Sequence, residues 1–344
     1  MRCIDIHTHL MPPKLPRWAE TFGYGGFIQL EPIAESGTPP CRARMVRDDG
    51  TFFREVEANC WDPAARLGDC DRHGVGVQVL STVPVLFAYW AKPEHGRDVS
   101  RFLNDHLAGV VREHPRRFVG LGTLPLQDPQ LAIEELERCM GELGMAGVQL
   151  GTHVGPWNLD APELFGVLQR AAELGAAVFI HPWDMLAPER MRKYWMPWLV
   201  GMPAESALAI SSVIFGGVLE RLPDLRIAFA HGGGAFPGTF GRIQHGFEAR
   251  PDLCATDNPH PPERYLKRIY LDGLVHEPHA LRLLLSLFGP ERIALGTDYP
   301  FPLGELEPGR LIRSLPELDD ATRERLLLGT ALEWLDRTRE QFDL

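Results

Sequence analysis

The chain has 344 residues, of which 44% are hydrophobic and 24% are charged, so it is long enough to bury a large core. Its 46 acidic residues outnumber its 35 basic residues and give a net charge of −11. This balance argues against general binding to nucleic acid or to an anionic membrane, because such binding depends on a basic surface. An acidic protein can still have a local positive charge inside a pocket.

The N-terminus and the cysteines favour a cytosolic protein. The opening MRCIDIHTHLMPP has no long apolar stretch behind a basic region, so no secretory signal is expected. Six cysteines are scattered without a CxxC pair, which fits reduced thiols better than a disulfide framework or a zinc knuckle. They are Cys3, Cys41, Cys60, Cys70, Cys139 and Cys254.

Eight short apolar runs rich in β-forming residues recur along the chain, and most are separated by segments with helical periodicity. Segments 129–144 and 162–175 are typical helices, with apolar residues at steps of three and four and a glycine at the end. Strand followed by helix, eight times, predicts a (β/α)8 TIM barrel. The predicted strands are 3–7, 76–82, 118–124, 147–153, 177–183, 226–232, 268–274 and 292–298.

Two stretches interrupt this rhythm. Residues 11–60, with many glycines and prolines and the turn sequence DDG at 48–50, are too long for one connection and predict a small β-rich insertion after the first strand. Residues 184–222 are rich in tryptophan, methionine and proline and show a helical pattern near 204–221. Because no repeat or flexible linker is present, we expect residues 1–344 to form one domain.

The first predicted strand runs into the sequence DIHTH, in which His7 and His9 are two residues apart. In an extended strand their side chains face the same side, and two imidazoles aimed at one point suggest a bound cation. A pair of hydrogen-bonded polar residues at a strand end is the alternative, and this motif alone does not decide between the two.

Three more predicted strands end in residues that bind metals or move protons, namely His181, His231 and Asp298. Each has an ordinary explanation, such as a buried imidazole bonded to a carbonyl or an aspartate that caps a turn. However, catalytic groups in such barrels lie at the C-terminal ends of the strands. The joint placement of these residues therefore predicts a metal site at the mouth of the barrel.

The residue types indicate which metal is expected. Three imidazoles and one carboxylate, without a thiolate, suit Zn²⁺ with an open position for water. The predicted fourth strand, GVQLGTH, has no lysine that could bridge two ions, so one zinc ion per subunit is expected. With the other three histidines and Asp298 as ligands, His231 is left beside the ion as a general base.

Four motifs resemble the amidohydrolase superfamily: DIHTH at 5–9, HPW at 181–183, AHGGG at 230–234 and GTDYPFP at 296–302. Further stretches, among them ANCWDP, KYWMPWLVGMPAE and LGTDYPFPLGELEPG, are similar to its decarboxylating branch. The resemblance extends from residue 1 to about residue 342. It implies a zinc-dependent enzyme that removes CO2 without oxidation, with the zinc ligands on His7, His9, His181 and Asp298 and the catalytic histidine on His231.

The resemblance also implies how a substrate is held. Two arginines that bind substrate carboxylates in that branch match Arg54 and Arg242, and the second is supplied by the neighbouring subunit. A homodimer with composite sites and a small anionic dicarboxylate substrate are therefore implied, and a guanidinium suits such a substrate through bidentate bonds. Trp198 and Phe301 match pocket walls.

Two alternatives stay open. The same ion and histidine could hydrolyse an amide, lactone or ester, since nothing in the ligand set forbids it. The other alternative is a catalytically silent barrel with a closed structural zinc site, although a base such as His231 beside the ion argues against it. The segment 31–49 is longer than in the family it resembles, so the substrate contacts of the insertion are not predicted beyond Arg54.

Overall fold

The computed structural model describes residues 2–34 and 41–344, and its central element is an eight-stranded parallel sheet. The strands pair in the order β1-β5-β6-β7-β10-β11-β12-β13. All eight predicted strands are present, and six of them end two to four residues before the predicted boundary. Their bounds are Cys3–Leu10, Val75–Thr82, Phe118–Gly122, Gly147–Gly151, Ala177–His181, Arg226–Phe229, Tyr270–Asp272 and Ile293–Ala294.

The last strand returns to the first and closes the barrel. Because β13 itself is short, the closing bonds come from the residues after it. Asp298 donates its backbone N–H to the carbonyl of His7 at 2.9 Å, and His9 donates its backbone N–H to the carbonyl of Tyr299 at 2.8 Å. The predicted (β/α)8 barrel is confirmed, and the same bonds bring the ends of the first and eighth strands together.

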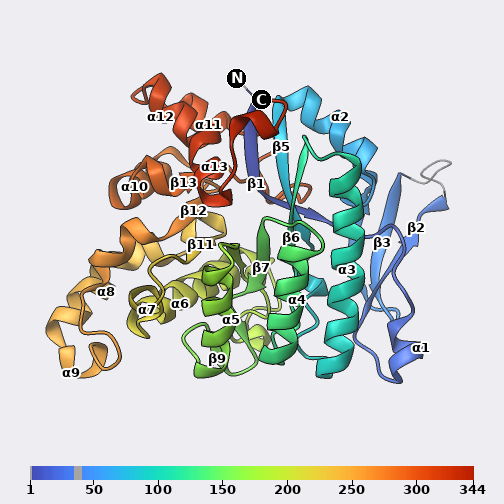
Figure 1. Cartoon of the computed structure of the whole chain (residues 1–344), viewed down its shortest axis with the longest axis horizontal. Helices are drawn as coiled ribbons and strands as arrows, with labels where there is room; N and C mark the ends of the chain where they lie inside the picture. The colour runs from blue at the N-terminus through green and yellow to red at the C-terminus, as the bar shows by residue number, and fades with distance from the viewer. Residues whose placement is uncertain (1, 35–40) are drawn as a thin grey trace.

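Helices cover the outside of the barrel (Figure 1). The helix predicted near 204–221 is divided into α6 and α7 at Gly216 and Gly217, because Gly217 has a φ of +68° that ends helical geometry. The helices are α1 (Trp18–Phe22), α2 (Pro63–His73), α3 (Pro93–Glu113), α4 (Pro129–Gly141), α5 (Pro162–Glu173), α6 (Met202–Phe215), α7 (Val218–Arg221), α8 (Phe236–Ala249), α9 (Pro251–Cys254), α10 (Pro278–Phe288), α11 (Arg310–Ser314), α12 (Asp320–Glu324) and α13 (Thr330–Leu335).

The N-terminal end of the barrel is plugged by the C-terminal helix α13, and both chain termini lie near this end (Figure 1). Trp334 on α13 is fully buried, packs against Phe179 of β10 and donates its indole N–H to the carbonyl of Arg226 at 3.2 Å. Apolar burial of this size stabilises the fold and excludes water from that end. The polar strand ends lie at the opposite end.

The stretch after the first strand contains a three-stranded antiparallel sheet made of β2 (Ile28–Pro32), β3 (Arg42–Arg47) and β4 (Phe52–Glu57). This agrees with the predicted β-rich insertion, of which residues 35–40 lie outside the described residues. The buried side of the sheet, including Met45 and Val56, shares an apolar cluster with loops at the mouth of the barrel and with α3. The insertion therefore forms one wall of that mouth.

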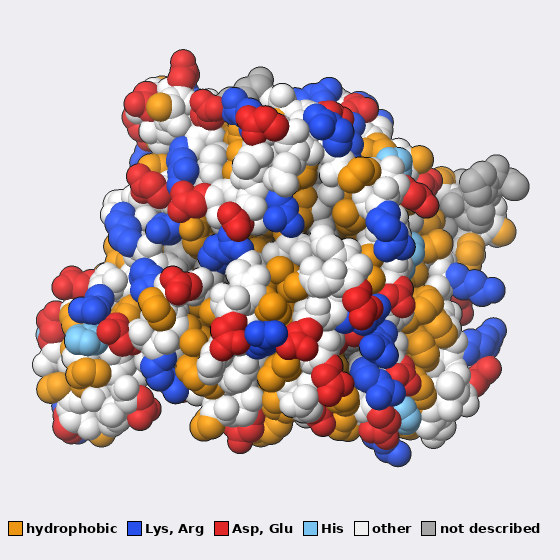
Figure 2. All heavy atoms as spheres, viewed as in Figure 1, with side chains coloured by type: hydrophobic (Ala, Val, Ile, Leu, Met, Phe, Trp, Pro, Cys, Tyr) orange, Lys and Arg blue, Asp and Glu red, His pale blue; other side chains and the backbone are white. Residues whose placement is uncertain are grey.

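The surface and the cysteines fit the expectations from composition. Figure 2 shows acidic and basic side chains interspersed over the face that it draws. Among the described residues, Cys3, Cys60, Cys70, Cys139 and Cys254 are free thiols. Among the described residues, Pro197–Phe215 is the one helical stretch that would be long and apolar enough to cross a membrane, and half of it is buried in the fold.

Candidate active site

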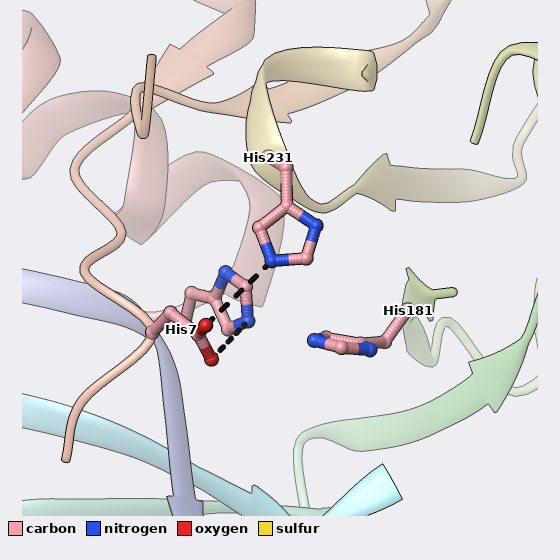
Figure 3. Close-up of side chains that lie close together, drawn as sticks. His7, His181 and His231 are labelled. Atoms are coloured by element: carbon pink, nitrogen blue, oxygen red, sulfur yellow. Dashed lines mark ion pairs between the residues drawn. The ribbon is translucent and has the colours of Figure 1, made fainter. Parts of the chain in front are cut away.

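Side chains from four strands of the barrel meet at its C-terminal mouth. His7 and His9 lie on β1, His181 is the last residue of β10, His231 comes two residues after β11, and Asp298 comes four residues after β13. Figure 3 shows His7, His181 and His231 pointing toward one another. The structure thus brings together all five side chains that the sequence singled out for a metal site.

The spacing of these atoms suits one small cation. One nitrogen or oxygen atom from each of His7, His181, His231 and Asp298 lies within 4.8 Å of all the others. Nε2 of His9 is 3.2 Å from Nε2 of His7 and 3.0 Å from Oδ1 of Asp298. Ligands of a tetrahedral zinc ion, each about 2.0–2.2 Å from it, lie about 3.4 Å from one another. His7, His9 and Asp298 already have this separation.

Hydrogen bonds on the far side of three imidazoles fix where their protons are. Nδ1 of His9 donates to the carbonyl of Thr82 at 3.0 Å, Nδ1 of His181 donates to the carbonyl of Pro182 at 3.0 Å, and Nδ1 of His7 donates to a carboxylate at 2.6 Å. A neutral imidazole has one N–H, so each Nε2 presents a lone pair to the centre.

The centre therefore holds acceptors without a proton to share. The Nε2 lone pairs of His7, His9 and His181 face the carboxylate of Asp298, and Nε2 of His181 is buried without a hydrogen-bond partner. Such an arrangement needs a cation, because buried acceptors that face one another repel. The donor set of three imidazoles and one carboxylate fits Zn²⁺ or a similar divalent ion.

The local electrostatics favour the metal-binding form of the ligands. Burial lowers the pKa of His9, and burial and the neighbouring histidines lower the pKa of His181 well below its ordinary value. Burial alone would raise the pKa of Asp298, but the interaction with His231 and the other surrounding histidines holds it well below its ordinary value. At neutral pH these groups are two neutral imidazoles and a carboxylate, which is the state that binds a metal.

His231 differs from the other histidines in its electrostatics. Burial lowers its pKa, but the nearby carboxylate of Asp298 and the charge of Asp272 outweigh this and leave the pKa above its ordinary value. Its Nε2 is 3.8 Å from Oδ2 of Asp298, and its Nδ1 is buried without a hydrogen-bond partner. This ring can take up and release a proton beside the metal-binding atoms.

The backbone at His231 and Asp298 is strained. Their φ values are +56° and +58°, in the left-handed region that residues with a Cβ seldom adopt. Such conformations persist where the surroundings over-determine them, and they occur often at functional sites. At Asp298 the backbone bonds that close the barrel hold the conformation, so fold and site geometry are joined at this residue.

Asp272, at the end of β12, is a site residue that sequence reasoning missed. Its fully buried carboxylate is the acceptor for Nδ1–H of His7, and it also accepts backbone N–H bonds from His231 at 2.9 Å, Gly232 at 2.7 Å and Leu274 at 3.1 Å. It therefore orients one imidazole and the turn that carries another. The signal was an aspartate at the end of the seventh predicted strand, RIYLDGL.

Asp5, another buried carboxylate, joins the first strand to the eighth. It accepts bonds from the backbone N–H of His7 and from the N–H and hydroxyl of Thr297, and burial raises its pKa to about 7. Thr297 directly precedes Asp298. Asp5 therefore acts on the site through the backbone rather than as a ligand.

A cavity with about 410 Å³ of empty space, part of it open to solvent, leads to this centre. Its lining includes three of the four predicted metal ligands, His9, His181 and Asp298, and both predicted wall residues, Trp198 and Phe301. Sequence reasoning missed several other residues of the cavity wall. The motif HPW and the tryptophan-rich segment were the sequence signals that could have indicated them. The lining residues are His9, Phe53, Arg54, Val83, Pro84, His181, Trp183, Trp195, Trp198, Met202, Asp298, Phe301, Pro302 and Leu303.

Arg54 of β4 brings a positive charge into this cavity. Its guanidinium carbon lies 4.6 Å from the ring centre of Phe301, 5.6 Å from that of Trp198 and 5.2 Å from that of Phe53. Burial lowers its pKa, although the charge of Asp298 opposes this. Among the described residues no carboxylate forms an ion pair with Arg54, so its donors can bind an anionic ligand.

Arg242 lies on α8, is exposed and is not part of the cavity wall of its own chain. Of the nine predicted site residues it is the one that the single chain does not bring to the centre. Its predicted role therefore concerns the active site of a neighbouring subunit.

Replacing Asp272 tests its control of His7. In the Asp272→Asn variant the amide offers one acceptor oxygen in place of two, so it cannot accept all the bonds that the carboxylate accepts. We expect the affinity for Zn²⁺ to fall about 10- to 100-fold, as for other partners of metal-bound imidazoles. Competition with a chromophoric chelator measures this. Asp320→Asn, an exposed site, is the matched control, and unchanged affinity in Asp272→Asn would contradict the assignment.

The lowered pKa of His181 predicts a pH dependence of stability in the metal-free chain. The unfolded chain protonates this imidazole below about pH 6.5, whereas the folded chain does not, so its contribution is present above that pH and is lost as the pH falls. On going from about pH 7.5 to about pH 5.5, wild type should lose about 1 kcal/mol more unfolding free energy than His181→Asn. Urea unfolding measures this, with His245→Asn as the control, and equal losses would refute the prediction.

Comparison with known proteins supports the fold and the family. The profile of the family described as Amidohydrolase matches residues 4–337. The chain is 54% identical to the 2-amino-3-carboxymuconate-6-semialdehyde decarboxylase of Dictyostelium discoideum, over 96% of this chain and 91% of that protein. It is 41% identical to the enzyme of the same name from Caenorhabditis elegans, over 97% of this chain and 94% of that protein.

Solved structures show the same fold at lower identity. The Metarhizium anisopliae IDCase, in apo form, aligns with a TM-score of 0.82 at 21% identity, covering 97% of both chains. A 5-carboxyvanillate decarboxylase from Sphingomonas paucimobilis aligns with a TM-score of 0.77 at 22% identity, covering 98% of this chain and 99% of the other. With the sequence relatives, these comparisons show that the chain belongs to the amidohydrolase family, in the group that includes the 2-amino-3-carboxymuconate-6-semialdehyde decarboxylases.

Proposed function

We propose that this protein is a metal-dependent decarboxylase that converts 2-amino-3-carboxymuconate 6-semialdehyde into 2-aminomuconate 6-semialdehyde and CO2. This is a step of the kynurenine pathway of tryptophan catabolism. The names of the two relatives above 40% identity support the reaction. The observation that carries the proposal is the convergence of three unprotonated imidazole nitrogens and a carboxylate at the mouth of the barrel.

The proposed metal is a single Zn²⁺ ion held by His7, His9, His181 and Asp298. Support comes from the donor types and from the buried, unpartnered Nε2 of His181. A dihydroxybenzoic acid decarboxylase from Polaromonas with the same fold was solved with bound manganese, so metal analysis is part of the test. When bound, the ion supplies Lewis acidity, which stabilises negative charge on oxygen and acidifies water.

The protein groups have separate tasks in this mechanism. Arg54 binds a substrate carboxylate within its aromatic surround, which orients the substrate and excludes water. As CO2 leaves, the electron pair of the broken C–C bond remains on carbon, and that carbon takes up a proton. His231 is the proposed carrier of this proton, because its Nε2 faces the centre and Asp298 favours its protonated form.

We propose that the active form is a homodimer in which Arg242 reaches the neighbouring active site. An apolar surface in the segment that directly precedes α6 supports this, since exposed apolar patches of this kind mark contact surfaces. Tyr194, Trp195, Leu199 and Val200 are between 41% and 78% exposed. Helix α6, which continues directly from this segment, packs against α8, which carries Arg242.

Residues 1–344 are proposed to form one domain, and the cytosol is its proposed location. The apolar cluster that the insertion shares with the barrel loops and α3 supports the first statement. The free thiols support the second, because thiols stay reduced in the cytosol.

The direct test is an activity assay with purified, zinc-loaded protein. We expect loss of the near-ultraviolet absorbance of 2-amino-3-carboxymuconate 6-semialdehyde with release of one CO2 per substrate, abolished by chelation and restored by Zn²⁺. His231→Ala should retain zinc and lose about 10²- to 10⁴-fold in kcat, the usual contribution of a proton-transfer group. Hydrolysis of an amide, lactone or ester without CO2 release would favour the hydrolase alternative, and zinc without any turnover would favour a structural site.

The composite site can be tested by complementation. His231→Ala and Arg242→Ala chains are each expected to be inactive, but a mixed dimer has one complete site, made of an intact His231 and the partner's intact arginine. Random co-assembly of equal amounts should restore about one quarter of wild-type activity. Co-expression with two affinity tags measures this. No recovery in verified mixed dimers would place Arg242 outside the site.

A further inference from the structure

The segment that follows β10 forms part of the cavity wall and has an unusual backbone. Trp183 lines the cavity, and the residues after it make a turn in which Asp184 and Ala187 have φ values of +57° and +49°. Two left-handed residues with a Cβ in one short turn are maintained only where other groups hold the turn. The question is which groups do this.

Two side chains from the barrel bond to the backbone of this turn. Glu205 of α6, which is 1% exposed, accepts the backbone N–H of Leu186 at Oε1, 2.7 Å away. His153, from the small strand β8 (His153–Val154), bonds through Nε2 to the carbonyl of Asp184 at 2.9 Å. Each bond reaches a different residue of the strained turn.

The two anchoring side chains also lie close to each other. Nδ1 of His153 lies 3.1 Å from the carbonyl of Gly155, so each ring nitrogen faces a carbonyl oxygen. The carboxylate of Glu205 lies 3.9 Å from Nε2 of this ring, so the two anchoring side chains are neighbours. The turn is therefore held from one side by two adjacent side chains, each bonded to its backbone.

The turn links Glu205 and His153 to Arg54, the residue proposed to bind a substrate carboxylate. The ring of Trp183 lies 6.0 Å from that of Phe53, edge to face, and the guanidinium of Arg54 lies against Phe53 and Phe301. A displaced turn would move Trp183 and release Phe53, so Arg54 would lose one side of its aromatic surround. Most of the metal-binding side chains depend on bonds outside this turn, because Asp272 holds His7 and the barrel closure holds Asp298. His181 is the last residue of β10 and bonds to the carbonyl of Pro182, which precedes the left-handed residues of the turn.

We propose that Glu205 and His153 are positioning residues, which hold the turn after Trp183 and thereby keep Arg54 and the cavity wall in place for the anionic substrate. This inference rests on the decarboxylase function proposed above. It assigns both residues to substrate binding and neither to the chemical step. Their loss should therefore raise KM and leave kcat and zinc content nearly unchanged.

The test uses zinc-loaded Glu205→Ala, Glu205→Gln and His153→Ala, with Glu163→Gln on the exposed surface of α5 as the matched control. For Glu205→Ala we expect KM for 2-amino-3-carboxymuconate 6-semialdehyde to rise about tenfold and kcat to change less than about twofold, as expected for loss of a hydrogen bond to a charged group. Glu205→Gln keeps an oxygen for the N–H of Leu186, so it should recover part of the KM. Hydrogen exchange in the peptide spanning 182–191 should be faster in Glu205→Ala and unchanged in the control.

Several results would overturn the proposal. They are an unchanged KM in Glu205→Ala, a fall in kcat that matches the rise in KM, or a raised KM with unchanged exchange in 182–191. If Glu205→Ala does not fold, Glu205→Gln and His153→Ala decide the matter, and wild-type KM and exchange in both would refute it. If wild type does not decarboxylate the substrate, the proposed function fails, and the exchange measurement by itself then supports or refutes the anchoring of the turn.

Discussion

The site depends on one electrostatic constraint: three imidazole lone pairs face a carboxylate in a buried place where no proton separates them. Without a cation the acceptors repel, and with one they become its ligands. The protons that would otherwise relieve the repulsion are held on the far side of each ring by Asp272 and by two backbone carbonyls. Those outer acceptors are what turn a group of histidines into a candidate metal centre.

The closure of the barrel positions these side chains, and one of the residues that close it has a strained backbone conformation. Asp298 takes part in the backbone bonding that joins the eighth strand to the first, and it does so with a left-handed φ. Asp5 and Asp272 add bonds from carboxylates that are themselves fully buried. Burying so many polar groups is costly unless each is bonded, and the backbone N–H groups of the strand ends provide those bonds. The rigid end of the barrel and the metal site are therefore one structure.

The residues proposed to bind the substrate lie on other elements. In an acidic protein, positive charge has to be concentrated where an anion binds, and Arg54 achieves this on an insertion that covers the mouth. Its guanidinium lies among aromatic rings from three separate segments of the chain. In the proposed function the chemistry comes from the barrel and substrate selection from the segments added to it, which is the usual division in this fold.

Much of this could be read from sequence. The alternation of strands and helices predicted the barrel, because burial on both faces makes such strands almost wholly apolar. The His7 and His9 pair and the polar residues at the ends of other strands predicted the site, since side-chain alternation and strand direction fix where those residues point. The sequence motifs also indicated Arg54, Trp198 and Phe301, which the structure places in the cavity wall.

Other features were decided by the tertiary structure. Asp272 has the same local signal as Asp298, an aspartate at a strand end, but its role as an acceptor arises only when other strands bring His7 and His231 to it. The anchoring of the turn by His153 and Glu205 has the same origin. The sequence by itself determined which side chains lie at the mouth of the barrel, because periodicity is local. Contacts between distant segments decide which nitrogen of each imidazole carries a proton and which aromatic side chains surround Arg54. Only the folded chain brings those segments together.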